Sequence, residues 1–468
     1  MLTLTALALS SILSASLVVA QGVGTYEKEV HPQFPIQTCT ATGARSGPNC
    51  VNVPTSITLD ANWRWLHNNN GYINCITDNY WNTTLCPDNK SCAANCVLDG
   101  ADYKGVYGIT TNSSAANGGT LNMRLYTPYN FATNIGSRVF VMEEGSETKY
   151  RVWKLLNREI SFEIDVSRLP CGSNAALAFV EMDADGGMGK QKLNTAGARY
   201  GTGYCNAKCP KDLRLVNGEA NCEDWQPSEV DRIAGTGRYG SCCAEFDIWE
   251  ANKMSTALTA HSCSLTAPAK CEGSACNDGL CDKDGCDFNS YRLGDTGFYG
   301  LNKTIDTNKK FTVVTQFVTH DDTDTGELVE IRRKYWQNGR EIKNSITKIP
   351  NMVPANGISD GFCRDQKAAF NETNTFKKLG GMNSVGAALR RGMVLAISIL
   401  HNYDNEMLWL DGKWPKDADV GKPGVVRGEC QGDSGTPLMV EGARPQVSFG
   451  KMRVGPIGET TSLIITRN

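Results

Sequence analysis

Three carboxylates are crowded into one short apolar segment, EFDIWEAN at 245–252. Glu245, Asp247 and Glu250 are separated there by Phe, Ile and Trp, residue types that favour a buried strand. In a regular strand, Glu245 and Asp247 point to the same face about 7 Å apart, and like charges this close raise one another's pKa. One carboxyl of such a group can stay protonated as an acid while another is ionised as a nucleophile.

Glu250 has the wrong parity for the face shared by Glu245 and Asp247. It can join them only if the strand is bulged or kinked near Ile248–Trp249. An isolated ExDxxE would be better interpreted as an exposed strand with a charged outer face. The rest of the chain decides between this interpretation and a catalytic group of carboxylates.

The first twenty residues are uncharged, mostly apolar and small. They predict a signal peptide, residues 1–20, cleaved before Gln21, and no other run is long and apolar enough for a membrane span. We therefore expect a secreted, extracellular protein. The net charge of −3 and the pI near 6 argue against nucleic acid or an anionic membrane as a partner.

Nineteen cysteines in an exported chain indicate disulfides, and the odd count leaves one thiol over. The five histidines are scattered, so zinc is disfavoured, and we expect no metal and no cofactor. Two acidic runs, at 183–185 and 322–324, resemble the start of a calcium loop but lack its closing Glu, which favours turns. Five sequons suit a glycoprotein: Asn82, Asn89, Asn112, Asn302 and Asn371.

The strong hydrophobic periodicities have period two, which predicts strands around 162–166, 311–317 and 447–449. Residues 392–400 are typical of a strand buried on both faces, and Asn338-Gly339 predicts a type I′ hairpin. The best helix candidate is 367–381. Without a linker or repeat, residues 21–468 are expected to form one monomeric catalytic domain, a two-sheet antiparallel sandwich with long loops.

Tryptophans complete the set of candidate functional residues. Trp63 and Trp65 are expected on one face of an extended segment, and Trp409 follows a hydrophobic strand. Most of the nine Trp residues are interpreted as core. Exposed indoles, however, suit the apolar faces of glucose rings.

These pieces together resemble glycoside hydrolase family 7, the secreted cellobiohydrolases and endoglucanases that cleave cellulose. The motifs that carry the resemblance are DANWRW (60–65), TLCPDNKSC (84–92), MDADGG (182–187), NTAGARYGTGYC (194–205), GSCCAEFDIWEAN (240–252), DKDGCDFNSYRLG (282–294), EMLWLD (406–411) and VVRGEC (425–430). The resemblance implies an all-β, concanavalin-like jelly-roll sandwich whose disulfide-pinned loops form a substrate cleft or tunnel. It also implies retaining hydrolysis of cellulose or a related β-1,4-glucan.

Carried over by motif, Glu245 is expected to be the nucleophile, Asp247 the residue that orients and tunes it, and Glu250 the acid/base. Retaining enzymes need two such carboxyls about 5–5.5 Å apart. The resemblance assigns the other substrate-binding roles as follows: His261 near the acid/base, Trp63 and Trp65 as glycone-side platforms, Trp409 as the platform just past the scissile bond, and Asp284, Arg292 and Arg427 as product-side hydrogen-bonding groups.

The resemblance also implies a disulfide pairing that leaves Cys222 as the unpaired thiol. The expected bridges are Cys39–Cys50, Cys75–Cys96, Cys86–Cys92, Cys171–Cys430, Cys205–Cys243, Cys209–Cys242, Cys263–Cys281, Cys271–Cys276 and Cys286–Cys363.

At three positions the chain departs from the family. Leu400 stands where a Trp platform is common, Ala178 where a Tyr lies near the cleavage subsite, and Asn206 where an Asp follows GTGYC. The long loop 218–240 and the segment 423–430 favour a cellobiohydrolase, whereas the short segment 275–281 suits a more open form. An endoglucanase acting on open or decorated glucans is the alternative, and no cellulose-binding module is expected.

Two motifs or features point to other classes of protein. CQGDSGTP at 430–437 resembles the nucleophile motif of trypsin-like serine proteases, although Thr436 replaces a glycine and His261 is not followed directly by Cys. A non-catalytic glucan-binding lectin would share the fold, but the complete ExDxxE argues against it.

Overall fold

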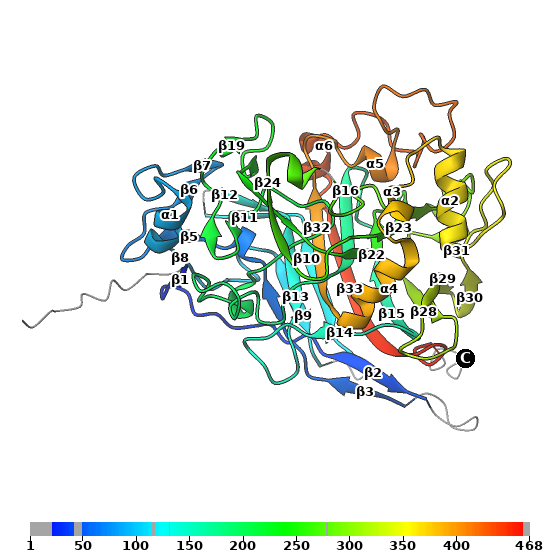
Figure 1. Ribbon diagram of the computed structural model, residues 1–468, viewed down its shortest axis with the longest axis horizontal. Coiled ribbons are helices and arrows are strands. Elements are labelled where there is room, and N and C mark those ends of the chain that lie inside the picture. The colour runs from blue at the N-terminus through cyan, green and yellow to red at the C-terminus, as the bar shows by residue number, and fades with distance from the viewer. Residues whose placement is uncertain (1–20, 42–48, 115–117, 131, 278, 462–468) are drawn as a thin grey trace, which may run out of the picture.

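A computed structural model describes residues 21–41, 49–114, 118–130, 132–277 and 279–461 of the protein. Two large sheets are stacked face to face, with loops and short helices around them (Figure 1). The predicted all-β sandwich is confirmed. The predicted signal peptide lies outside the described residues. No helix among the described residues is long and apolar enough to cross a membrane.

The outer sheet has ten strands and forms the back of the sandwich. Its strands are β3 (Asn49–Val53), β2 (Ile36–Thr40), β33 (Gln446–Pro456), β15 (Arg158–Asp165), β28 (Phe311–Thr319), β29 (Leu328–Gln337) and β30 (Arg340–Lys343), with β10 (Thr120–Arg124), β9 (Ile109–Asn112) and β31 (Gly357–Ile358) off this path.

The inner sheet has eight strands and holds the ExDxxE segment near its middle, in β22. Its order is β25 (Cys286–Asn289), β23 (Thr256–His261), β22 (Glu245–Ala251), β16 (Ser173–Val180), β32 (Met393–His401), β13 (Ser137–Val141) and β4 (Ile57–Leu59), with β14 (Val152–Trp153) beside β32.

The core lies between the two sheets and fixes the orientation of β22. Phe246 packs edge-to-face on Phe317 of β28 at 5.3 Å, and Trp249 on Phe162 of β15 at 6.1 Å between ring centroids. Truncating a buried Trp to Ala costs about 3–5 kcal/mol, so this anchoring is strong. Because one face of β22 is held in the core, the other must face out of the sandwich.

The strand predictions hold, and the helix prediction was wrong. The hairpin is present between β29 and β30, with positive φ at Asn338 and Gly339. Instead of one helix over 367–381, three short helices occur, α2 (Asp360–Ala369), α3 (Thr375–Lys378) and α4 (Gly381–Arg391). Ser359 caps α2 well before 367, and the left-handed Asn371 and Gly380 end the helical runs.

Smaller elements build the loops around the sandwich. They include β1 (Gly22–Val23), β5 (Leu66–Asn68), β8 (Cys96–Leu98), β6 (Ile76–Thr77), β7 (Tyr80–Trp81), β11 (Tyr126–Tyr129), β12 (Ala132–Ile135), β17 (Leu215–Val216), β18 (Glu219–Ala220), β19 (Gln226–Pro227), β20 (Gly235–Thr236), β21 (Tyr239–Cys242), β24 (Ala269–Glu272), β26 (Tyr299–Gly300), β27 (Ile305–Asp306), η1 (Ala61–Trp63), η2 (Ala198–Tyr200), η3 (Gly273–Cys276), α1 (Asn89–Asn95), α5 (Leu408–Asp411) and α6 (Pro437–Gly442).

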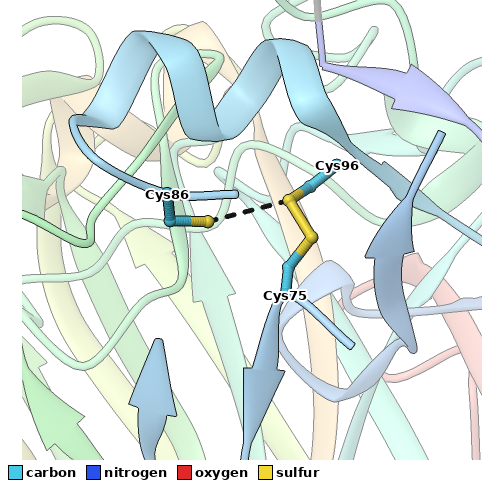
Figure 2. Close-up of side chains that lie close together, drawn as sticks. All are labelled: Cys75, Cys86 and Cys96. Atoms are coloured by element: carbon cyan, nitrogen blue, oxygen red, sulfur yellow. Dashed lines mark hydrogen bonds between the residues drawn. A yellow bond between two sulfur atoms is a disulfide. The ribbon is translucent and has the colours of Figure 1, made fainter. Parts of the chain in front are cut away.

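Nine disulfides pin these loops within the described residues, and they pair the cysteines as the resemblance implied. Figure 2 shows the Cys75–Cys96 bridge below α1, with the Cys86 sulfur 3.7 Å from that of Cys96. Cys222 is a half-buried free thiol, also as expected.

Candidate active site

The bulge required by the parity of Glu250 is present in β22. The registers of β22 with β16 and with β23 both shift by one residue between Asp247 and Glu250. The facing pairs with β16 are Glu245 with Val180, Asp247 with Ala178, and Glu250 with Ala176. Because alternate residues of β16 share a face, the extra residue, Ile248, brings all three carboxylates to one face of the inner sheet.

Glu245 is buried at the start of β22. Its Oε2 accepts a hydrogen bond of 3.0 Å from the backbone N–H of Ala207. Burial, with the neighbouring charge of Asp247, raises the pKa of Glu245 to about 7, against the opposing effect of His261 and Lys208.

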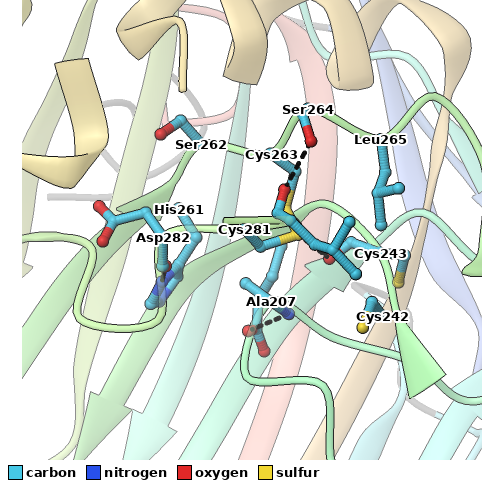
Figure 3. The surroundings of a disulfide bond; sticks show 12 residues. Ala207, Cys242, Cys243, His261, Ser262, Cys263, Ser264, Leu265, Cys281 and Asp282 are labelled. Atoms are coloured by element: carbon cyan, nitrogen blue, oxygen red, sulfur yellow. Dashed lines mark hydrogen bonds between the residues drawn. A yellow bond between two sulfur atoms is a disulfide. The ribbon is translucent and has the colours of Figure 1, made fainter. Parts of the chain in front are cut away.

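Asp247 is hydrogen-bonded to His261, which lies on the neighbouring strand β23. His261 Nδ1 lies 2.6 Å from the carbonyl oxygen of Asp282, and a carbonyl oxygen only accepts, so Nδ1 donates there (Figure 3). Nε2 lies 3.0 Å from Asp247 Oδ2, a contact that requires a proton shared by the pair. Burial raises the pKa of Asp247 to about 6, opposed by Lys208 and by a hydrogen bond with Glu245.

Glu250 completes the group. Asn174 Nδ2 donates to its Oε1 at 3.1 Å, while the same side chain accepts from the N–H of Ala251, which fixes the amide orientation. Burial and the charge of Asp247 raise the pKa of Glu250 to about 7. A group of three buried acids cannot ionise fully at neutral pH, so one remains protonated as a proton donor.

Glu245 is the better candidate for the ionised member. It receives the main-chain N–H of Ala207, and one of its oxygens lies within 4.8 Å of a His261 nitrogen. Donors of this kind favour the charged form of a carboxyl. The same donor atoms are close enough to hold a metal ion, but their hydrogen bonds to one another and to Ala207 already engage them.

Lys208 is a cation at this group that the sequence interpretation missed. Its Nζ lies 5.0 Å from the centroid of the Trp409 ring and makes no ion pair within 4.0 Å among the described residues. Desolvation opposes its charge, but Glu250 and Asp247, with smaller effects from Glu245 and Asp284, raise the pKa of Lys208 above its ordinary value.

The cysteine spacing could have identified Lys208. Cys205 and Cys209 bond to the consecutive residues Cys243 and Cys242, directly before β22. Two bridges to neighbouring residues must hold the intervening loop against Glu245, and Lys208 lies in that loop.

The profile of glycosyl hydrolase family 7 matches residues 23–461. The chain belongs to this family. Among solved structures, it is similar to a family 7 cellobiohydrolase from Daphnia pulex, with 46% identity and a TM-score of 0.89 over 94% of this chain and 100% of that one. It is also similar to a Melanocarpus albomyces cellobiohydrolase complexed with cellotetraose, with 39% identity and a TM-score of 0.85 over 94% of this chain and 99% of that one. With the Humicola insolens endocellulase EGI, the identity is 33% and the TM-score is 0.76, over 94% of this chain and 100% of that one.

The aromatic residues expected to bind glucan lie at separate places around the family 7 fold. Trp63 ends the short helix η1, and its indole N–H donates to the carbonyl of Ile135. Trp65 instead packs on the ring of His67 at 4.0 Å. The two indoles therefore do not lie on one face of an extended segment as predicted. Trp409 lies in α5, half-buried beside Lys208.

The charged residues expected on the product side differ in accessibility. Asp284 is exposed. Arg427 is half-buried and donates to the carbonyl of Trp409 at 3.2 Å, and burial together with the charge of Arg292 lowers the pKa of Arg427 to about 10. Arg292 is buried against Asp287, Glu372 and the carbonyl of Gly424, so little of it faces a ligand.

The three departures from the family pattern all lie on or next to the carboxylate face. Leu400 of β32 pairs with Asn174 of β16. Asn174 lies two residues before Ala176, which pairs with Glu250, so Leu400 is on the same face as Glu250. Ala178 faces Asp247 directly. Asn206 donates to the hydroxyl of Tyr204 and precedes the Ala207 N–H that binds Glu245.

Neither the protease motif nor the acidic runs form a second site. Ser434 Oγ donates to the carbonyl of Gln431 in its own turn, whereas His261 is bonded to Asp247 and Asp282. Family membership over nearly the whole chain excludes the serine protease. The runs at 183–185 and 322–324 lie in turns, as predicted.

Proposed function

We propose that the protein hydrolyses β-1,4-glucan with retention of anomeric configuration. The observation that carries the proposal is the bulge in β22, which aligns Glu245, Asp247 and Glu250 on the face of the inner sheet opposite the core. Two carboxyls on one face, one ionised and one protonated, are what a retaining glycosidase requires. Family membership and the cellulose-degrading relatives support cellulose as the substrate class.

Each residue has a defined role in this mechanism. Glu245 attacks the anomeric carbon while the Glu250 proton passes to the glycosidic oxygen, which leaves with its sugar. The resulting ester on Glu245 is broken by a water whose proton returns to Glu250, so both acids end in their starting states. Asp247, held by His261, orients Glu245, and its neighbouring charge tunes the pKa of Glu245.

Action from a chain end, releasing cellobiose, is favoured over internal cleavage. The cellobiohydrolase relatives are 39–46% identical to this chain, against 33% for the endocellulase. The long loop 218–240, held at its tip by Asn79 through the carbonyls of Ser228, Asp231 and Ala234, also supports a covered cleft.

The covalent structure supports an extracellular location. Nine disulfides within the described residues persist only in an oxidising compartment. A non-catalytic lectin is the second candidate, favoured only by the loss of bulk at Leu400 and Ala178 in the cleft.

Amorphous cellulose tests the proposal. The wild-type protein should release mainly cellobiose, whereas Glu245→Gln should bind cellulose normally and release none. Glu341→Gln, a change at an exposed glutamate on β30, is the matched control and should retain full activity. A wild-type protein that binds cellulose without releasing sugar would be a lectin, and a broad distribution of long products would indicate the endoglucanase alternative.

A further inference from the structure

Three near-parallel aromatic rings lie together beside β5, at Tyr26, Trp65 and Tyr72. The small sheet of β1, β8 and β5 lies at one end of the molecule, well apart from α5 (Figure 1). We call Tyr26, Trp65 and Tyr72 the outer platform. Tyr26 stacks on Tyr72 with 4.1 Å between centroids and 24° between planes, and Trp65 lies 6.1 Å and 22° from Tyr72. Tyr26 is 44% exposed and Tyr72 is 70% exposed.

The outer platform rests on a buried foundation. His67 packs under Trp65 at 4.0 Å and under Tyr26 at 5.3 Å. His67 Nε2 lies 2.9 Å from Asp99, and Asp99 also accepts from the backbone N–H of Tyr26. One buried carboxylate therefore ties the segment that carries Tyr26 to β5, which holds Tyr26 in position relative to Trp65.

The turn that carries Tyr72 is equally constrained. Asn68 bonds Ile73 through both its backbone N–H and its side-chain oxygen, and Asn74 accepts from the Trp65 indole at 2.7 Å. Cys75, the next residue, is bridged to Cys96 of β8 (Figure 2). Large exposed rings held this firmly are unfavourable in water unless something covers them.

We propose that the outer platform binds a β-1,4-glucan chain outside the cleft, before the chain reaches Trp65. The proposal rests on the proposed function, because Trp65 is the expected glycone-side platform and is continuous with the two tyrosines. A glucose ring has an apolar C–H face and a rim of hydroxyls, which suits a flat ring bordered by amides. The side chain of Asn70, beside Tyr72, is exposed and makes no hydrogen bond in the described part of the chain.

Adsorption to insoluble cellulose tests the proposal in a Glu245→Gln background, so that hydrolysis does not disturb the isotherm. Tyr72→Ala should weaken adsorption about 3- to 10-fold, the range expected for losing one aromatic contact. Tyr72→Phe should retain it. Tyr80→Ala is the matched control, because Tyr80 is 67% exposed on the neighbouring strand β7 and has no ring partner among the described residues.

Further readouts separate the possible failures. With Glu245 restored, Tyr72→Ala should cleave a short chromogenic cellobioside as fast as the wild type, because that substrate does not reach the platform. Equal adsorption of Tyr72→Ala and Tyr80→Ala would overturn the platform. So would a parallel loss of adsorption to polystyrene, which would mark a non-specific apolar patch. Absent turnover in the wild type would overturn the proposed function instead, because the adsorption assay needs no catalysis.

Discussion

Replacing Lys208 by Gln should move the whole pH–rate profile to higher pH. Lys208 is the cation that lowers the pKa of Glu245, Asp247 and Glu250, and its side chain makes no ion pair within 4.0 Å in the described structure. A cation favours the ionised form of a carboxyl, so removing the cation raises the carboxyl's pKa. The acid limb, which reports ionisation of the nucleophile, and the alkaline limb, which reports the acid/base, should both rise.

The size of the shift follows from the environment of the cluster. An opposite charge within about 4–6 Å lowers a carboxyl pKa by about 1–3 units, and solvent screening of the exposed Lys208 favours about 1 unit. His261 from β23 is the other charged group that acts on the carboxylates, Asp284 from the loop before β25 acts on Lys208, and both are unchanged in the variant. The face of β16 and β32 contributes only uncharged side chains, Asn174, Ala176, Ala178, Ala396 and Ser398.

The assay is kcat/KM on a soluble chromogenic cellobioside from pH 3 to 9. On the acid limb, Lys208→Gln should be about tenfold slower than the wild type, and on the alkaline limb it should be faster. Lys208→Arg should restore the profile. Lys343→Gln, at an exposed lysine on the outer sheet, should leave it unchanged. A uniform loss of rate at every pH, or a shift to lower pH, would refute the electrostatic role.

Three further predictions concern other residues. Leu400→Trp should tighten cellohexaose binding several-fold and slow turnover, because an indole offers a larger flat face; unchanged affinity by calorimetry would make Leu400 neutral. Asp411 is buried, and burial raises its pKa to about 7, so it favours the folded state at low pH and loses that effect as the pH rises from about 4 to 7. The Tm of Asp411→Asn should fall less than that of the wild type between pH 5 and 7.5, and parallel curves would contradict this. Cys222 should react slowly with a thiol reagent at pH 8 because burial raises its pKa to about 12, and rapid stoichiometric labelling would show that it is accessible.

The carboxylate group shows how far the sequence could be interpreted. The alternation of side chains along a strand predicted that Glu245 and Asp247 share a face and that Glu250 joins them only through a bulge near Ile248–Trp249. The bulge lies between Asp247 and Glu250, as predicted. The alternation of strand residues likewise predicted the two sheets, because a strand with one face in the core must repeat every two residues.

Other features depended on contacts between distant segments. Lys208 lies 37 residues before Glu245, and the two disulfides that hold its loop there could be expected only from the family resemblance, not from the local sequence around Glu245. Trp63 and Trp65 separate because Trp63 ends the 3-10 helix η1, so the segment is not extended there and alternate residues do not share a face. In the outer platform, Tyr26 stacks on Tyr72 and is tied to His67 through Asp99, and all these residues are far from Tyr26 in sequence.

Trapping the covalent intermediate tests the central claim most directly. A cellobioside with fluorine at C2 and a good leaving group slows hydrolysis of the ester more than its formation, so the glycosyl group accumulates on the nucleophile. Peptide mapping by mass spectrometry is predicted to find the added mass on Glu245. A label on Glu250 or Asp247, or no label together with release of the α-anomer from natural substrate, would contradict the proposed mechanism.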